Sequence, residues 1–188
     1  MNIFNKNLKN EILIIGEIGI NHEGKLSEAL KMLELASKSG LDAVKFQLYS
    51  LDKYQSKNNL KRYKRLKKFN LSDNDYKYLH KKAKKIGLKV IATPLTEDKV
   101  DLAGSFGEVV KVASGDIDFY PTIERIIKNK KKIILSTGNS NIKEIEKILN
   151  FIKKNYRKKK ISDYLALLHC VSLYPKPIEE RNILKINY

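Results

Sequence analysis

Six short runs of apolar residues recur along the chain, and stretches with a helical spacing of apolar positions separate them. The runs cover residues 12–19, 42–47, 89–94, 108–115, 132–138 and 164–170. Each run is nearly continuously apolar, which is typical of strands that are buried on both faces. Strands of this kind that alternate with helices form a parallel sheet covered by helices, so the pattern predicts an α/β fold.

Start and stop signals place helices between these runs. Ser72 can cap a helix, with Asp75 three residues later, and Gly87 can end it. The other expected helices begin near Ser27, Thr96, Pro121 and either Asn139 or Asn141. Residues 51–70 carry no such pattern, and we expect a long polar loop there.

The residues that end the runs favour a barrel over an open doubly wound sheet. Nearly every run finishes in polar or charged residues beside Gly or Pro, namely Glu17, Lys45 and Gln47, Thr93, Lys111 and Ser114, Ser136, and His169. In a β/α barrel all strand ends converge on one mouth, where catalysis takes place, whereas an open sheet spreads them. The predicted fold class is therefore α/β, a parallel (β/α) TIM-type barrel.

The barrel is expected to be incomplete. We count about six of the eight strand-helix units, and a full barrel typically has about 250 residues, whereas this chain has 188. A single domain over residues 1–188 is predicted. Either this domain is truncated, or another chain completes it.

Composition and charge limit the compartment and the binding partners that we expect for this protein. Hydrophobic residues make up 42% of the chain, no apolar run reaches the length of a membrane span, and the N-terminus lacks a signal-peptide pattern. The single Cys170 allows no internal disulfide, so a cytoplasmic protein is expected. The net charge of +17 comes from 38 Lys and Arg against 21 Asp and Glu. We interpret it as a solvated lysine coat and do not expect nucleic acid as a partner, although residues 57–68 form a basic patch.

Two lysines within apolar strands are the main candidate for chemistry. Lys45 and Lys111 occupy matching positions near the ends of their runs. A lysine in such a strand is costly to bury unless it is paired or faces a ligand. Together with the hydroxyls of Thr93, Ser114 and Ser136, the two ammonium groups would bind a phosphate or a carboxylate. The alternative is that each lysine pairs with a local carboxylate or extends to solvent.

Further polar groups surround this predicted anion site. Glu17 ends the first run in a Gly-rich turn, where a carboxylate can act as a general base or bind a sugar hydroxyl. Asn21, His22 and Glu23 add polar groups in the following loop, where His22 and Glu23 are either site residues or ordinary loop residues. His169 ends the sixth run and is either structural or catalytic, and Tyr174 would place a phenol at the mouth. No short metal-binding motif is present in the sequence.

The ordered motifs at the strand ends resemble those of the N-acetylneuraminate (sialic acid) synthase family, which includes the legionaminic and pseudaminic acid synthases and the spore-coat polysaccharide synthases. The resemblance runs from about Ile12 to Arg181. It rests on Glu17-Ile-Gly-Ile-Asn-His-Glu-Gly, Val44-Lys-Phe-Gln, Ala92-Thr-Pro, Lys111-Val-Ala-Ser-Gly, Leu135-Ser-Thr-Gly and Leu168-His-Cys-Val-Ser-Leu-Tyr-Pro.

The resemblance implies a reaction and a set of site residues. Members of this family are β/α barrels that condense phosphoenolpyruvate with N-acetylmannosamine or a related amino sugar to a nine-carbon 2-keto sugar acid. The positions that match phosphoenolpyruvate binding are Lys45, Thr93, Lys111, Ser114, Ser136 and Ser172. The positions that match sugar binding are Glu17, Gln47 and Tyr174, and those that match catalysis are Glu17, Asp116 and Tyr174.

Departures from the family pattern shape the remaining expectations. Asp116 stands where the family usually has Glu. A divalent metal, manganese or magnesium, is expected for the family, but its two histidine ligands lie on the last two strands, so no metal ligand is expected in this chain. The family also carries a C-terminal antifreeze-like domain, which we do not expect in this chain. We therefore leave open an active synthase fragment, an inactive remnant that binds phosphoenolpyruvate or a partner chain, and a basic nucleic-acid-associated protein. A homodimer and a completing chain both stay open.

Overall fold

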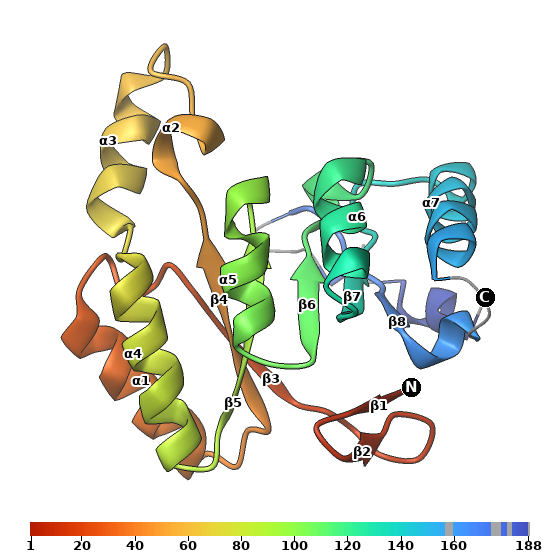
Figure 1. Cartoon of the computed structure of the whole chain (residues 1–188), viewed down its shortest axis with the longest axis horizontal. Coiled ribbons are helices and arrows are strands. Elements are labelled where there is room, and N and C mark those ends of the chain that lie inside the picture. The colour runs from red at the N-terminus through yellow and green to blue at the C-terminus, as the bar shows by residue number, and fades with distance from the viewer. Residues whose placement is uncertain (157–159, 174–177, 180–181, 188) are drawn as a thin grey trace.

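The computed structural model describes residues 1–156, 160–173, 178–179 and 182–187, and Figure 1 shows a curled parallel sheet with helices on its outer side. Six strands follow one another across the sheet in chain order: β3 (Ile15–Gly19), β4 (Ala43–Leu48), β5 (Lys89–Pro94), β6 (Val109–Val112), β7 (Lys132–Ser136) and β8 (Leu165–Leu168). Each of the six predicted runs coincides with one strand, and β4 extends one residue beyond its run. Because every neighbouring pair is parallel, the carboxyl ends of all six strands lie at one edge.

Helices connect the strands as the start and stop signals predict. They are α1 (Leu26–Lys38), α4 (Asp73–Lys85), α5 (Val100–Ser105), α6 (Tyr120–Lys128) and α7 (Ile142–Asn155), with the short turns η1 (Glu97–Lys99), η2 (Ser114–Asp116), η3 (Ile161–Asp163) and η4 (Ile183–Asn187). Ser72 and Asp75 form the expected capping box of α4, and Asn141, not Asn139, caps α7. Thr96 makes no side-chain cap to η1; its hydroxyl instead accepts a hydrogen bond from the backbone N–H of Ser50 at 3.1 Å.

The expectation of a polar loop over residues 51–70 is wrong. This segment contains α2 (Leu51–Tyr54) and α3 (Leu60–Phe69). Asn59 caps α3 by accepting a hydrogen bond from the N–H of Arg62 at 3.1 Å. Leu66 is the buried residue of α3, and its carbonyl accepts a hydrogen bond from the Tyr49 hydroxyl at 2.8 Å. One buried anchor and one cap hold this helix, so it lacks the apolar stripe by which a helix is usually found.

A second small sheet at the N-terminus covers part of the main sheet. The antiparallel strands β1 (Asn2–Ile3) and β2 (Lys6–Asn7) place Ile3 in a wholly buried cluster with strand residues Ala43, Ile91, Val109 and Ile134. The larger core lies between the other face of the strands and the helices, and it includes Val44, Phe46, Val90 and Val110. Because neighbouring strand residues point to opposite faces, the hairpin packs on the inner, concave face.

Exchanging Gly24 for alanine should destabilise the fold more than the same exchange at Gly40, by about 2 kcal/mol or more. Both glycines have left-handed φ angles, +76° and +74°, so both variants carry similar backbone strain. A Cβ at Gly24 would lie 2.0 Å from the carbonyl oxygen of Lys68 in α3, whereas a Cβ at Gly40 meets nothing within 4 Å. Urea unfolding of the two variants measures the difference. Equal losses would contradict close packing of α3 on the loop after β3.

Candidate functional site

Lys45 is the most deeply buried charged residue at the carboxyl end of the sheet. Its side chain is 4% exposed, and its Nζ lies 2.6 Å from Oε2 of Glu17 on the adjacent strand. The register of β3 and β4 places these two residues directly opposite each other. The Glu17 side chain is 55% exposed, so the pair joins a buried ammonium to a carboxylate at the surface. This ion pair offsets part of the cost of burying the charge.

Lys111 reaches the same region from β6. Lys45 is two residues after Ala43 and Lys111 is two residues after Val109, so both follow a residue of the concave cluster and point to the concave side. Burial lowers the pKa of Lys111 from its usual value, and the positive charge of Lys45 lowers it further, while Glu17 acts in the opposite direction. The two lysines therefore lie on the same side of the sheet, close enough to influence each other.

Two buried hydroxyls at this end of the sheet have no hydrogen-bond partner among the described residues. Thr93 is 1% exposed and Ser136 is 2% exposed, yet neither Thr93 Oγ1 nor Ser136 Oγ is bonded. Ser114 differs, because its Oγ accepts a hydrogen bond from the N–H of Gly138 at 3.1 Å. Buried polar groups are nearly always satisfied in native proteins. Thr93 and Ser136 therefore hold hydrogen-bonding groups at the carboxyl ends of β5 and β7 that no described residue uses.

A carboxyl and an amide group lie near the carboxyl ends of β6 and β4. Asp116 is half-buried in η2, and burial raises the pKa of its carboxyl, with a smaller contribution from the charge of Asp118. The raised pKa means that the surroundings of Asp116 favour its neutral form. Gln47 is half-buried near the end of β4. If Gly19 carried a β-carbon, that atom would lie 4.0 Å from Nε2 of Gln47. The Gln47 amide therefore extends toward the end of β3.

The remaining predicted residues, His169, Cys170, Ser172 and Tyr174, follow β8 in the sequence. Ser172 is exposed in the segment after β8, and Tyr174 lies outside the described residues. His169 is exposed, and Cys170 is half-buried against Gly138.

His22 belongs to the core rather than to the rim. It is wholly buried, and its ring centroid lies 6.4 Å from that of Phe46 on the helix-covered face of the sheet. Its Nδ1 accepts a hydrogen bond from the N–H of Gly24 at 3.1 Å, and burial lowers its pKa. The interpretation of His22 as an ordinary loop residue is therefore wrong. The side chain is buried, and it stabilises the loop after Glu17 through the hydrogen bond with Gly24.

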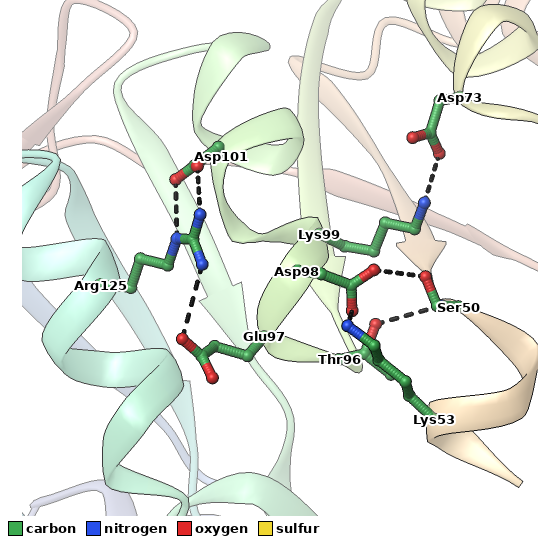
Figure 2. A network of polar contacts seen from close by, with 9 residues as sticks. All are labelled: Ser50, Lys53, Asp73, Thr96, Glu97, Asp98, Lys99, Asp101 and Arg125. Atoms are coloured by element: carbon green, nitrogen blue, oxygen red, sulfur yellow. Dashed lines mark hydrogen bonds and ion pairs between the residues drawn. The ribbon is translucent and has the colours of Figure 1, made fainter.

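A polar network that the sequence did not indicate ties together the loops behind the site (Figure 2). Asp98 in η1 accepts a hydrogen bond from the Ser50 hydroxyl, and its Oδ1 lies 3.5 Å from Nζ of Lys53. The neighbouring Lys99 pairs with Asp73 at the start of α4 at 2.7 Å. These contacts fix the loops that follow β4 and β5 relative to each other. No sequence motif predicts these contacts, because the two residues of each pair are 26 to 48 positions apart in the sequence.

The same network continues onto α6. Arg125 Nη2 lies 2.5 Å from Asp101 Oδ2, and Arg125 Nη1 lies 3.5 Å from Glu97 Oε1 (Figure 2). The Asp101 carboxylate also accepts a hydrogen bond from Asn129 at 2.8 Å. The paired Arg125 guanidinium lowers the pKa of Asp101. The network therefore joins α6 to the helical segments that follow β5.

A curled parallel sheet with cationic and hydroxyl side chains at the carboxyl ends of its strands defines an incomplete β/α barrel with a candidate active site at its mouth. A sequence profile of the NeuB family matches residues 32–188, and the chain belongs to this family. This result confirms the resemblance that the strand-end motifs indicated.

Individual relatives agree with this assignment. The N,N'-diacetyllegionaminic acid synthase of Campylobacter jejuni is 38% identical over 185 residues, which cover 91% of this chain and 54% of that protein. An uncharacterized protein of Methanocaldococcus jannaschii is 38% identical over 171 residues, 90% of this chain and 49% of its own length. The chain thus spans about half the length of the curated relatives it matches.

Solved structures confirm the incomplete barrel. The N-acetylneuraminic acid (sialic acid) synthetase of Leptospira borgpetersenii, in complex with citrate, superposes with a TM-score of 0.85 at 29% identity. The match covers 95% of this chain and 62% of that one. A truncated 3-deoxy-D-arabino-heptulosonate 7-phosphate synthase of Thermotoga maritima, 14% identical with a TM-score of 0.61, shares the fold.

Two features are not found among the residues that the structure describes, a metal-binding cluster and a membrane-spanning helix. In that part of the chain, no three His, Cys, Asp or Glu side chains gather in a way that could hold a metal ion. None of its helices is both long enough and apolar enough to cross a bilayer.

Proposed function

We propose that the chain binds phosphoenolpyruvate at the carboxyl ends of β4 to β7 and forms this part of a NeuB-type synthase. The synthase would condense phosphoenolpyruvate with N-acetylmannosamine or a related amino sugar to a nine-carbon 2-keto sugar acid. The observation that carries the proposal is the pair Lys45 and Lys111 on one side of the sheet, beside the unpartnered hydroxyls of Thr93 and Ser136. Similarity to N,N'-diacetyllegionaminic acid synthases and to a pseudaminic acid synthase supports the same class of reaction.

The charges suit this ligand. Phosphoenolpyruvate carries a phosphate and a carboxylate, and the buried Lys45 and the half-buried Lys111 supply two positive charges. The hydroxyls of Thr93, Ser136 and Ser114 would donate directional hydrogen bonds to its oxygens, and Ser172 would approach from the loop after β8. A ligand of this kind would give both unpartnered hydroxyls a hydrogen-bond partner.

Glu17, Asp116 and Tyr174 are proposed for the sugar and the reacting centre. The exposed Glu17 carboxylate, which pairs with Lys45, would accept a hydrogen bond or a proton from an incoming sugar hydroxyl. Asp116, whose pKa is raised by burial, would supply a proton. Gln47 would bind a sugar hydroxyl through its amide. For Tyr174 we propose the role that the family resemblance implies, in sugar binding and catalysis.

The metal and the remaining parts of the enzyme belong to the proposal as well. The NeuB family is generally metal-dependent, but the described residues do not gather a metal-binding set, and no step is assigned to a metal here. That residues 1–188 form one domain of the synthase barrel stays a prediction. A second copy or a completing chain would supply what the synthase reaction still needs.

Isothermal titration of the 188-residue protein with phosphoenolpyruvate tests the proposal. We expect saturable binding with one site, and weaker binding of pyruvate and of inorganic phosphate, because each occupies only part of the charge pattern. Phosphoenolpyruvate that binds no better than inorganic phosphate would overturn it. Adding N-acetylmannosamine and manganese then separates an active fragment from one that binds the ligand without turnover.

The affinity for phosphoenolpyruvate should fall as the pH rises through the lowered pKa of Lys111. The free protein holds this pKa below its ordinary value of 10.5 through burial and the charge of Lys45. A bound anion favours the protonated lysine and raises the pKa, so binding is strongest where Lys111 is already protonated. Dissociation constants measured from neutral to alkaline pH should increase by up to about tenfold per pH unit. A Lys111→Met variant should lack this dependence, and a dependence that persists unchanged would assign it to another group.

A further inference from the structure

The positive charge of the molecule is concentrated on two consecutive helices. Residues 60–85 contain eleven Lys and Arg but only two Asp, a net charge of +9 out of the +17 of the whole chain. All eleven are exposed, and together they are called the basic ridge: Lys61, Arg62, Lys64, Arg65, Lys67 and Lys68 of α3, and Lys77, Lys81, Lys82, Lys84 and Lys85 of α4. More than half of the net charge therefore comes from these 26 residues.

The charge of the basic ridge is not neutralised locally. Asp73 pairs with Lys99 outside the ridge, and Asp75 is occupied in the capping box with Ser72. Within the described residues, no carboxylate forms an ion pair with any residue of the ridge. Like charges at these spacings on a helix repel one another. A bound polyanion would relieve that repulsion.

The shape of the ridge fits a long partner. The α3 and α4 helices have 10 and 13 residues, which at 1.5 Å per residue gives about 35 Å in total. Figure 1 shows them following one another along one side of the molecule. A small metabolite would meet only a few of these side chains. Duplex nucleic acid carries a phosphate charge about every 1.7 Å along its axis, so it offers negative charge over the whole length of the ridge.

The apolar residues of these helices argue against a membrane surface. An interfacial helix inserts a continuous apolar face into the headgroup region. In α3, Leu66 is buried against the protein, and in α4 the buried residues are Tyr76, Leu79 and Ala83. The large apolar side chains that are exposed, Leu60 and Tyr78, lie at separate places. The ridge thus offers charge without an inserting face.

We propose that the basic ridge binds the phosphate backbone of double-stranded nucleic acid without reading its sequence. Lys and Arg side chains on the outward faces of α3 and α4 would contact successive phosphates and release their counterions. Duplex is favoured over single strands because single-strand binding relies on a series of stacking aromatic rings. On the ridge, Tyr78 is exposed and Lys82 Nζ already lies over its ring at 5.2 Å. This inference is independent of the phosphoenolpyruvate site.

Fluorescence anisotropy with a labelled duplex of about two turns tests the inference. The expected result is binding whose logarithmic salt slope is about −0.9 for each phosphate contacted, with a slope of about −4 or steeper between about 50 and 200 mM salt. The variant with Lys61→Gln, Lys64→Gln, Lys67→Gln and Lys68→Gln should bind at least about tenfold more weakly, with a shallower slope. All four side chains are exposed, so the variant should keep its fold, which circular dichroism checks.

A matched variant removes the same charge elsewhere. Lys38→Gln, Lys128→Gln, Lys143→Gln and Lys147→Gln also lowers the net charge by four at exposed positions outside the ridge. It should retain most of the affinity. Equal weakening by both variants would show a response to net charge alone and would overturn the proposal. So would tighter binding to anionic phospholipid vesicles than to the duplex, or a salt slope shallower than about −1.

Discussion

Replacing Lys45 with methionine should lower the affinity for phosphoenolpyruvate by about 30-fold or more. Removing one partner from a buried charge contact costs about 2 to 5 kcal/mol of binding free energy, and about 1.4 kcal/mol corresponds to a factor of ten. The Lys45 side chain is 4% exposed, so water compensates little for the lost ammonium group. Lys111→Met should act in the same direction with a smaller effect, because Lys111 is only half-buried and already loses part of its charge at alkaline pH.

The control for this prediction is Lys89→Met at the opposite end of the sheet. Lys89 begins β5 and is exposed, so its loss removes the same charge away from the proposed site and should change the affinity by less than about twofold. The fold should survive in Lys45→Met, since methionine is apolar and the Glu17 carboxylate left behind is 55% exposed and can be hydrated. Unchanged binding by a folded Lys45→Met protein would remove Lys45 from the site.

The main sheet could be predicted because each of its strands is marked by residues that are consecutive in the sequence. Each strand is a buried apolar run with a polar end, and the alternation of side chains fixes which residues share a face. The matching places of Lys45 and Lys111 in their runs were therefore enough to predict a common side. The capping box of Ser72 and Asp75 is equally local and was also confirmed.

Features that depend on distant partners could not be read from the sequence. The α3 helix is anchored by Leu66 and the Tyr49 hydroxyl, and a single buried residue leaves no periodic pattern. The absence of a protein partner for Thr93 and Ser136 is a property of the assembled site. The burial of His22 against Phe46 depends on how the loop after β3 folds back, which its polar composition does not reveal.

Exchanging Ile3 for alanine should destabilise the protein by about 2 to 4 kcal/mol. Ile3 is wholly buried in the concave cluster, although it lies in a strand of two residues near the N-terminus. The hairpin is also held by polar contacts: the N–H of Phe4 donates to Glu108 Oε1 at 2.6 Å, and Lys132 Nζ donates to the carbonyl of Asn2 at 2.6 Å. The loss of three carbons leaves a cavity above the inner faces of β4 to β7, which these contacts keep from closing.

Ile12→Ala separates this packing effect from a general loss of hydrophobicity. Ile12 is 78% exposed, so the same truncation there should change the free energy of unfolding by no more than about 0.5 kcal/mol. Urea unfolding followed by far-ultraviolet circular dichroism gives both values. Similar values would mean that the hairpin does not close the concave face. A large difference would mean that the strands carrying Lys45 and Lys111 depend on the N-terminal residues for their stability, because the concave cluster lies directly beneath the proposed site on the same face of those strands.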